Sequence, residues 1–147
     1  MEKGRRLALD YGLVRIGVAV SDPEGLFVFP VTTLEASDWE DGLRDLISEY
    51  NPTAIYIGYP ITLTGNVGSA ANLARDFAIE VGEKFRGTIR LIDERLSTKS
   101  AAMQMRESGR SERDSRKDID AVAASLLLEQ ALMTEKNTGQ FAGSEIR

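Results

Sequence analysis

The first 34 residues of the chain contain three apolar runs separated by tight turns. Residues 5–9, 14–20 and 27–34 are rich in valine, isoleucine and leucine, and β-branched residues favour β-strands. The segments between the runs, DYGL and SDPEG, combine aspartate, glycine and proline as short hairpin turns do. Because consecutive strands joined by short turns pair antiparallel, this stretch predicts a three-stranded antiparallel meander.

After the meander, helical and strand patterns alternate. Apolar spacing predicts amphipathic helices near residues 39–50, 70–85 and 119–127, and Ser37 with Glu40 has the spacing of a capping box before the first of them. The runs TAIYIGYP and TIRLIDERL predict two buried strands. Since strands that alternate with helices join a sheet in parallel, the predicted fold class is α/β. We expect a mixed sheet, the meander plus two parallel strands, with helices on both faces.

A chain of 147 residues, 42% of them hydrophobic, fits one domain with a sizeable core. We assign residues 1–135 to this domain and residues 136–147, which lack periodicity, to a flexible C-terminal tail. We place Trp39, Phe77 and Phe85 in the core. No apolar segment approaches the roughly 20 residues that span a bilayer, and no signal-like segment follows the charged start MEKGRR, so we expect a cytoplasmic protein.

The chain has no cysteine and no histidine. This composition excludes disulfides, zinc sites built from thiolates or imidazoles, cysteine nucleophiles and catalytic triads that contain histidine. Any chemistry that the chain performs must therefore use carboxylates, hydroxyls, amines and the backbone. Of these groups, carboxylates are the ones that bind divalent metal ions.

The net charge is −5, but the charge is unevenly distributed. Residues 95–117 contain seven basic and three acidic residues, so this segment carries a charge of +4. Such a segment is most often a solvated helix face, but it could also contact the phosphates of a nucleic acid. Its basic members are Arg95, Lys99, Arg106, Arg110, Arg113, Arg116 and Lys117.

Binding sites in sheets of this kind collect at the carboxyl ends of the strands. Acidic residues occupy three such positions: Asp10 after the first strand, Asp93 or Glu94 after the last, and Asp118 or Asp120 at the start of the final helix. Converging carboxylates repel one another unless a cation neutralises them, and an all-oxygen set selects Mg²⁺ or Mn²⁺. Two such ions about 4 Å apart can activate water and stabilise the leaving oxygen in phosphodiester hydrolysis.

Each acidic residue also has a purely structural interpretation. Asp10 could be a turn residue, because aspartate is common in hairpins. Glu94 could form a surface ion pair with the arginine that follows it, and Asp118 could cap the final helix. Asp120 fits a solvated role less well, because it follows the apolar Ile119 and precedes small residues of the helix face that packs on the sheet.

The segment GYPITLTGNVGSAA has two interpretations as well. Gly58, Gly65 and Gly68 could only supply turns before a helix. Alternatively, backbone amides at the start of that helix could bind a phosphate. The segment is not a Walker loop, because it has no lysine at the required position.

Four sequence blocks, in order, resemble the YqgF family, also called RuvX. The blocks are LALDYGLVRIGVAVSD, IGYPITLTGNVGSAANLARDFA, LIDERLSTKSA and RKDIDAVAASLLLEQAL. Together they extend the resemblance over residues 5–133. The resemblance implies a ribonuclease H-like fold and a metal-dependent endonuclease, which matures the 5′ end of pre-16S ribosomal RNA or resolves Holliday junctions.

The resemblance also implies the site residues. Asp10, Glu94 and Asp120 would be catalytic and would bind Mg²⁺ or Mn²⁺. Beyond the resemblance, we predict Asp93 or Asp118 as auxiliary ligands. The positions assigned to contacts with nucleic acid are Arg15, Gly65, Gly68, Arg95, Lys99, Arg116 and Lys117, and Gly17 also occupies a family-like position.

Two other functional classes stay open at this stage. An actin-like ATPase can begin with a similar aspartate and glycine turn, although such enzymes normally close two domains on the nucleotide and this chain has room for one. A nucleic-acid-binding module that does not cleave would carry its carboxylates only as a structural cluster. The choice between RNA and branched DNA, and between a monomer and a homodimer, also stays open, because paired cuts in a junction favour two active sites.

Overall fold

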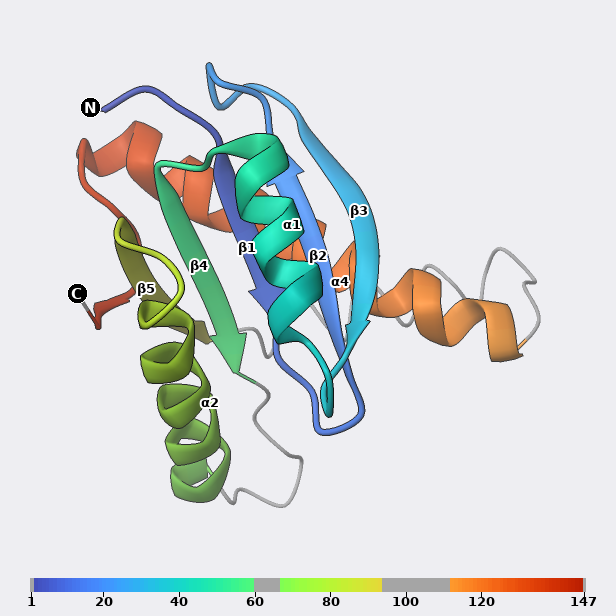
Figure 1. The fold of residues 1–147 in the computed structure, drawn as a ribbon. Helices are drawn as coiled ribbons and strands as arrows, with labels where there is room; N and C mark the ends of the chain where they lie inside the picture. The colour runs from blue at the N-terminus through green and yellow to red at the C-terminus, as the bar shows by residue number, and fades with distance from the viewer. Residues whose placement is uncertain (1, 60–66, 94–111, 147) are drawn as a thin grey trace.

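The computed structural model in Figure 1 describes residues 2–59, 67–93 and 112–146. Within these ranges the chain forms six strands and three helices. In chain order they are β1 (Arg6–Asp10), β2 (Arg15–Ser21), β3 (Val28–Glu35), α1 (Glu40–Tyr50), β4 (Ala54–Tyr59), α2 (Val67–Gly82), β5 (Thr88–Asp93), α4 (Glu112–Thr138) and β6 (Ser144–Glu145).

The strands form one sheet with the order β3-β2-β1-β4-β5-β6. β2 pairs antiparallel with both β1 and β3, whereas β1, β4 and β5 run parallel to one another. The predicted meander and the two parallel strands are therefore confirmed, although each strand of the meander begins one residue later than predicted. A mixed sheet of this order, with helices on both faces, is the ribonuclease H-like architecture that the sequence resemblance implies.

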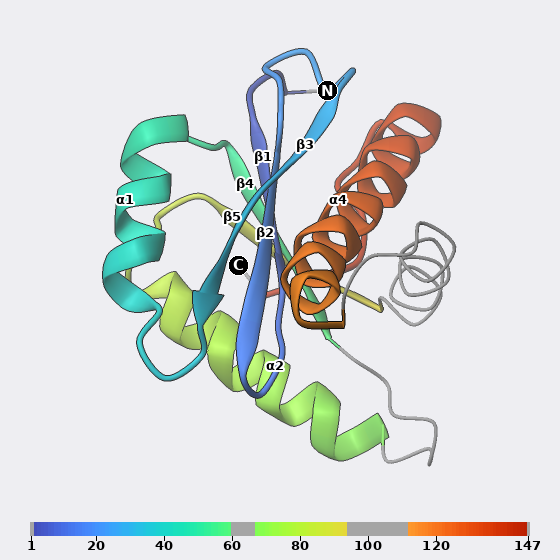
Figure 2. The same ribbon diagram turned by 90° about the vertical axis from the view of Figure 1, so that its right-hand side faces the viewer.

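The three helices divide between the two faces of the sheet. Figures 1 and 2 show α1 and α2 on one face and α4 across the other. Side chains along a strand alternate between faces, and β1 accordingly sends Leu7 and Leu9 to the core under α1 and α2 and Ala8 to the core under α4. The sheet is thus covered on both sides, and the continuous apolar runs of its central strands follow from that burial.

Aromatic residues fill the core under α1 and α2. Trp39, Phe77 and Phe85 are buried, which confirms their predicted place. The Phe77 ring stacks on Tyr11 with their centroids 4.7 Å apart and meets Trp39 edge-on at 4.9 Å. Helical spacing in residues 70–85 predicts Leu73 on the buried face of the second helix, but Leu73 is 43% exposed, so this prediction is wrong.

The starts of two helices differ from the prediction. α1 begins at Glu40, and Trp39 is its N-cap with no side-chain hydrogen bond, so the predicted capping box of Ser37 and Glu40 does not form. Glu40 occupies the first helical position, whereas a capping box needs its acidic residue at the third. α4 begins at Glu112, which places Asp118 inside the helix, so its interpretation as a cap is wrong.

Small side chains let α4 lie close to the sheet. Helical spacing in the sequence predicts a stripe of Ile119, Val122, Ala123, Leu126 and Leu127 on this helix. Ala123 and Leu127 are fully buried, whereas Ile119, Val122 and Leu126 are only half-buried. The stripe is therefore rotated from the predicted one, and its fully buried members are Ala123, Ala124, Leu127, Leu128 and Ala131. None of the helices in the described ranges is long and apolar enough to cross a membrane.

After α4 the chain returns to the sheet. Ser144 and Glu145 form β6, which pairs antiparallel with β5. Ala142 is buried beside the α4 core, and Ile146 packs against the core on the other face. The lack of periodicity in residues 136–147 gives no sign of this strand in the sequence, and the flexibility predicted for the segment stays a prediction.

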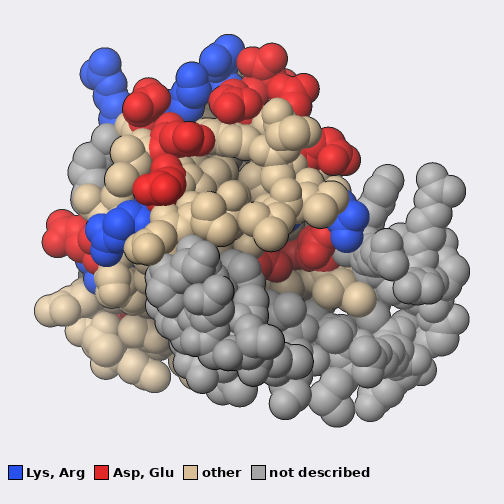
Figure 3. All heavy atoms as spheres, turned by 90° about the horizontal axis from the view of Figure 1, so that it is seen from below, with Lys and Arg blue, Asp and Glu red and all other residues tan. Residues whose placement is uncertain are grey.

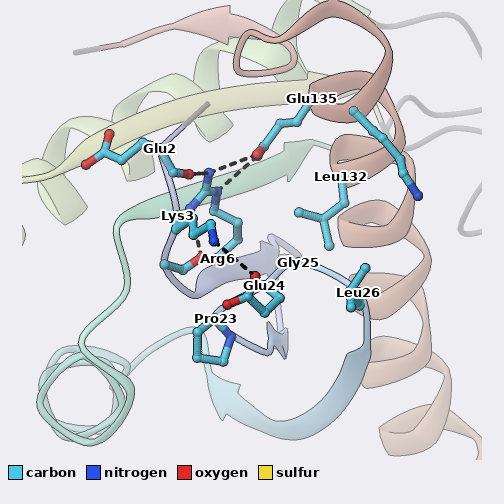
Figure 4. A pocket seen from close by; sticks show the side chains of 11 residues that line it. Glu2, Lys3, Arg6, Pro23, Glu24, Gly25, Leu26, Leu132 and Glu135 are labelled. Atoms are coloured by element: carbon cyan, nitrogen blue, oxygen red, sulfur yellow. Dashed lines mark hydrogen bonds and ion pairs between the residues drawn. The ribbon is translucent and has the colours of Figure 1, made fainter.

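A buried ion pair joins the start of the sheet to the end of α4. Arg6 donates from Nε to Glu135 Oε2 at 3.1 Å and from Nη2 to Oε1 at 2.9 Å, and the Tyr56 hydroxyl donates to Oε2 at 2.5 Å. Figure 4 shows Arg6 facing Glu135 beside a cavity of about 240 Å³. Burial, together with the hydrogen bond to Glu135, raises the pKa of Tyr56 well above its ordinary value.

Candidate active site

The carboxyl ends of β1, β4 and β5 lie in register at one edge of the sheet. Asp10 is the last residue of β1 and pairs with Gly58 of β4, which in turn pairs with Ile92 of β5. Strands lie about 4.8 Å apart, so the backbones of Asp10 and Ile92 are roughly 10 Å apart, a gap that facing side chains can bridge. Asp10 and Asp93, the last residues of β1 and β5, therefore belong to one edge of the sheet.

Asp10 is held on the face that α4 covers. It follows Ala8 by two residues, so the alternation of the strand directs both side chains to that face. Only 8% of Asp10 is exposed. The next residue, Tyr11, donates its backbone N–H to Gly58 O at 3.2 Å and stacks its ring on Phe77, which fixes the chain where it leaves the strand.

Gly17 allows the backbone of Asp120 in α4 to lie beside Asp10. Gly17 is the β2 partner of Asp10, and a β-carbon on it would overlap the backbone carbonyl of Asp120. The backbone of α4 therefore rests directly on β2 beside Asp10, which only a residue without a side chain permits. The sequence marked Gly17 as a family-like position but gave no physical role for it, because the contact joins residues far apart in the chain.

Arg15 forms an ion pair with Asp120. The Arg15 Nε donates to Asp120 Oδ2 at 2.7 Å, and the two side chains are 27% and 26% exposed. The sequence indicated that Asp120 fits a solvated role less well, and this carboxylate does lie in a half-buried contact between α4 and β2. Arg15 was predicted to contact nucleic acid, and its contact with a predicted metal ligand is a second feature that the sequence did not reveal.

For several predicted site residues, the residue itself or its side chain lies outside the part of the chain that the structure describes. Glu94, Arg95, Lys99 and Gly65 lie outside the described residues. Gly68 lies in α2, Arg116, Lys117 and Asp118 lie in α4, and Asp93 ends β5, but their side chains are outside the described part as well.

The described acidic residues have the type of ligand atom that a hard divalent cation prefers. Their side chains offer carboxylate oxygens, and the chain has no cysteine or histidine that would favour zinc or a softer metal. Among the described residues no group of three or more acidic side chains lies close enough to hold a metal ion. A site with three carboxylates therefore requires, besides Asp10 and Asp120, an acidic residue whose side chain lies outside the described part, such as Asp93, Glu94 or Asp118.

The surface at this end of the molecule is largely uncharged, with a few charged side chains at its margin (Figure 3). Figure 3 shows the end toward which β1 and β4 point in Figure 1. Carboxylates and a basic side chain lie next to one another there, at the margin of a largely uncharged surface. With Asp10, Asp120 and Arg15, the edge combines carboxylates that could bind a cation with a guanidinium that could bind a phosphate.

Sequence comparison gives a match over nearly the whole chain. The family model described as RuvX: Holliday junction resolvase matches residues 4–134. A Streptomyces coelicolor protein is 39% identical over 150 residues, covering 99% of this chain and 90% of the relative. A Thermobifida fusca protein is 40% identical over 147 residues, covering 94% and 92%. Both relatives carry the name "Putative pre-16S rRNA nuclease".

Comparison of folds gives a more distant likeness. Thermus thermophilus RuvC in complex with a Holliday junction substrate aligns with a TM-score of 0.48 at 16% identity, covering 97% of this chain and 99% of that chain. The sequence match carries the assignment, because it spans β1 to β5, Asp10 at the end of β1 and most of α4. The chain belongs to the RuvX family.

Proposed function

We propose that this chain is a metal-dependent endonuclease that processes the 5′ end of pre-16S ribosomal RNA in the cytoplasm. Its curated relatives are named for that RNA, and the family description names a nuclease that acts on branched DNA. Both names describe the cleavage of phosphodiester bonds in structured nucleic acid. The composition agrees with this class, since it leaves carboxylates as the only side chains suited to binding hard cations.

One observation carries the proposal. Asp10 and Asp120 come from a strand and a helix 110 positions apart in the numbering, and the contact through Gly17 places them at one edge of the sheet. Glu94 directly follows β5, which ends at the same edge, and we propose it as the third carboxylate.

Asp10, Glu94 and Asp120 would hold one or two Mg²⁺ or Mn²⁺ ions, with Asp93 or Asp118 as auxiliary ligands. When bound, such ions lower the pKa of water and stabilise charge on the leaving oxygen. The protein side chains then have two tasks. The carboxylates hold the ions at the edge of the sheet, and the basic residues hold the phosphates of the strand to be cut.

The basic residues proposed for phosphate contacts include one with a described position. Arg15 lies at the edge beside Asp120, so a phosphate bound to its guanidinium would lie next to the proposed ligands. The other proposed contacts are Arg95, Lys99, Arg116 and Lys117, with backbone amides at Gly65 and Gly68. The concentration of positive charge in residues 95–117 would offset the net charge of −5, which otherwise weakens attraction to nucleic acid.

Cleavage assays test the proposal directly. The substrates are an RNA that contains the 5′ leader joined to the 16S sequence and a four-way DNA junction, each with Mg²⁺, Mn²⁺ or a chelator. We expect D10N and D120N to lower the cleavage rate by at least about 100-fold, because the loss of a ligand exceeds the loss of an outer contact. D41N, which removes the exposed carboxylate of Asp41 on α1, is the control and should cleave as the parent does. Parental activity in D10N would overturn the catalytic assignment.

The family description supports Holliday junction resolution as the second candidate. A resolvase makes paired cuts and favours two active sites on one junction, whereas RNA trimming needs only one. A preference for the junction over the RNA, with cuts paired across it, would favour this candidate. Accumulation of RNA precursors with immature 5′ ends in cells depleted of the protein would instead favour RNA processing.

A further inference from the structure

We propose that Arg15 is a built-in counter-ion of the acidic site, which neutralises its carboxylates when no divalent cation is bound and competes with a cation that binds. The observation behind this inference is the contact between Arg15 Nε and Asp120 Oδ2, 2.7 Å long. Hydrogen bonds between charged partners at this distance are among the stronger ones in proteins. The inference rests on the proposed function, because it assumes that Asp120 is a metal ligand.

The fold holds Arg15 in this place without help from a ligand. Arg15 is the first residue of β2 and pairs with Glu35 of β3. It precedes Gly17 by two residues, so its side chain lies on the face where Gly17 meets α4. Since β2 runs antiparallel to β1 and Gly17 pairs with Asp10, Arg15 lies just beyond the end of β1, at the edge that carries the acidic site.

The charges at the edge explain why a counter-ion is useful there. Carboxylates gathered at one edge without a cation repel one another, and part of Asp10 and Asp120 is removed from water, which strengthens the repulsion. Arg15 reduces the formal charge of these two carboxylates from −2 to −1. Without Arg15 the edge is therefore less stable when empty and attracts a cation more strongly.

The hydrogen bond from Arg15 to Asp120 Oδ2 also affects cation binding. A cation that shares Asp120 Oδ2 must either displace the guanidinium or bind beside its positive charge, and both oppose binding. Removal of Arg15 should therefore tighten cation binding. An alternative is that Arg15 only orients Asp120, in which case its removal would weaken cation binding. The two interpretations thus predict opposite changes in cation affinity when Arg15 is removed.

Calorimetric titration with Mn²⁺ separates the two interpretations without any measurement of activity. We expect R15Q to bind Mn²⁺ about 3- to 10-fold more tightly than the parent at low ionic strength, and this gain to shrink as salt is added. R15K keeps the charge and should stay within about twofold of the parent. R44Q removes the same charge from α1, on the opposite face of the sheet, and should leave the affinity unchanged.

Thermal unfolding in a chelator provides the second measurement. We expect R15Q to melt below the parent without metal and to approach the parent at saturating Mn²⁺, because tighter cation binding then stabilises its folded state more. Equal or weaker Mn²⁺ binding by R15Q, with binding by the parent that D10N abolishes, would overturn the counter-ion role and leave the proposed metal site standing. An absence of Mn²⁺ binding by the parent would overturn the proposed site and the counter-ion role with it.

Discussion

Gly17 in β2 and Asp120 in α4 are in backbone contact, and a β-carbon on Gly17 would overlap the carbonyl oxygen of Asp120. Because Gly17 is also the strand partner of Asp10, this contact sets how α4 lies relative to Asp10. We expect G17A to push α4 away from the sheet and to lower the free energy of unfolding by about 1–3 kcal/mol. Urea denaturation measures the loss of stability, and Mn²⁺ titration measures the loss of affinity expected to accompany it.

G42A is a matched control for that substitution. Gly42 lies in α1, and a β-carbon on it would meet only the end of the Leu34 side chain, which can move. Alanine also favours a helix over glycine by about 1 kcal/mol, so the stability of G42A should equal or exceed that of the parent. If G17A and G42A gave the same stability and the same Mn²⁺ affinity, the Gly17 contact would not control the site.

The buried pair of Arg6 and Glu135 yields a second prediction. Arg6 is 3% exposed, so E135A leaves a buried guanidinium without its carboxylate. We expect E135A to lower the free energy of unfolding by about 3–5 kcal/mol, the usual result of removing one partner of a buried ion pair. D41A breaks the exposed pair of Asp41 with Arg44 and should change stability by less than about 1 kcal/mol. Similar losses in the two variants would show that burial does not set the strength of the first pair.

A third prediction concerns alkaline pH. The raised pKa of Tyr56 means that the folded protein keeps a proton that the unfolded chain loses above about pH 10. The stability that Tyr56 confers is therefore complete below pH 10 and falls as the pH rises above it. Y56F should remove this part of the decline. It should also lower stability at neutral pH by about 1–3 kcal/mol, because the backbone N–H of Ala142 loses its acceptor.

Urea midpoints of the parent and Y56F between about pH 8 and pH 11 provide the measurement. The two curves should converge as the pH rises, since only the parent loses the contribution of Tyr56. Parallel curves over the whole range would contradict the assignment of the pH dependence to this hydroxyl.

A fourth prediction tests the docking of β6. Gly139 and Gly143 both have left-handed backbone angles, with φ of 72° and 73°. A β-carbon on Gly139 meets nothing within 4 Å, whereas one on Gly143 would overlap the carbonyl oxygen of Leu91 in β5. We expect G139A to lower the free energy of unfolding by about 1 kcal/mol, because of its left-handed backbone angle alone. G143A should lower it clearly more, because its β-carbon would also overlap Leu91. Equal losses would show that the contact of this segment with β5 contributes nothing to stability.

Signals that act over short distances in the chain were sufficient for most of the architecture. The apolar runs and turn residues of the first 34 residues predicted the meander, and helical spacing predicted Trp39 and Phe77 in the core. Strand ends then selected Asp10, because the carboxyl edge of a sheet follows from the order of its elements. Each of these inferences needs only the residues within one or two elements.

Contacts between distant elements could not be predicted in this way. The role of Gly17 depends on α4 resting on β2, and the burial of Arg6 depends on Glu135, 129 positions away. The strand at Ser144 has only two residues, too few for a periodic pattern, and forms because β5 offers a free edge. The rotation of α4 likewise follows from the sheet beneath it, since alanines rather than the larger Val122 suit the closest approach.

The long separation of Arg6 and Glu135 also constrains the order of events during synthesis. The ribosome releases Arg6 among the first residues, and its guanidinium can enter the core with a partner only after Glu135 has emerged. A nascent chain that stops before that point can form the meander but would have to bury an unpaired charge to close the domain. Closure of the domain over Arg6 therefore waits for Glu135, so a product truncated before Glu135 lacks the charge that β1 requires.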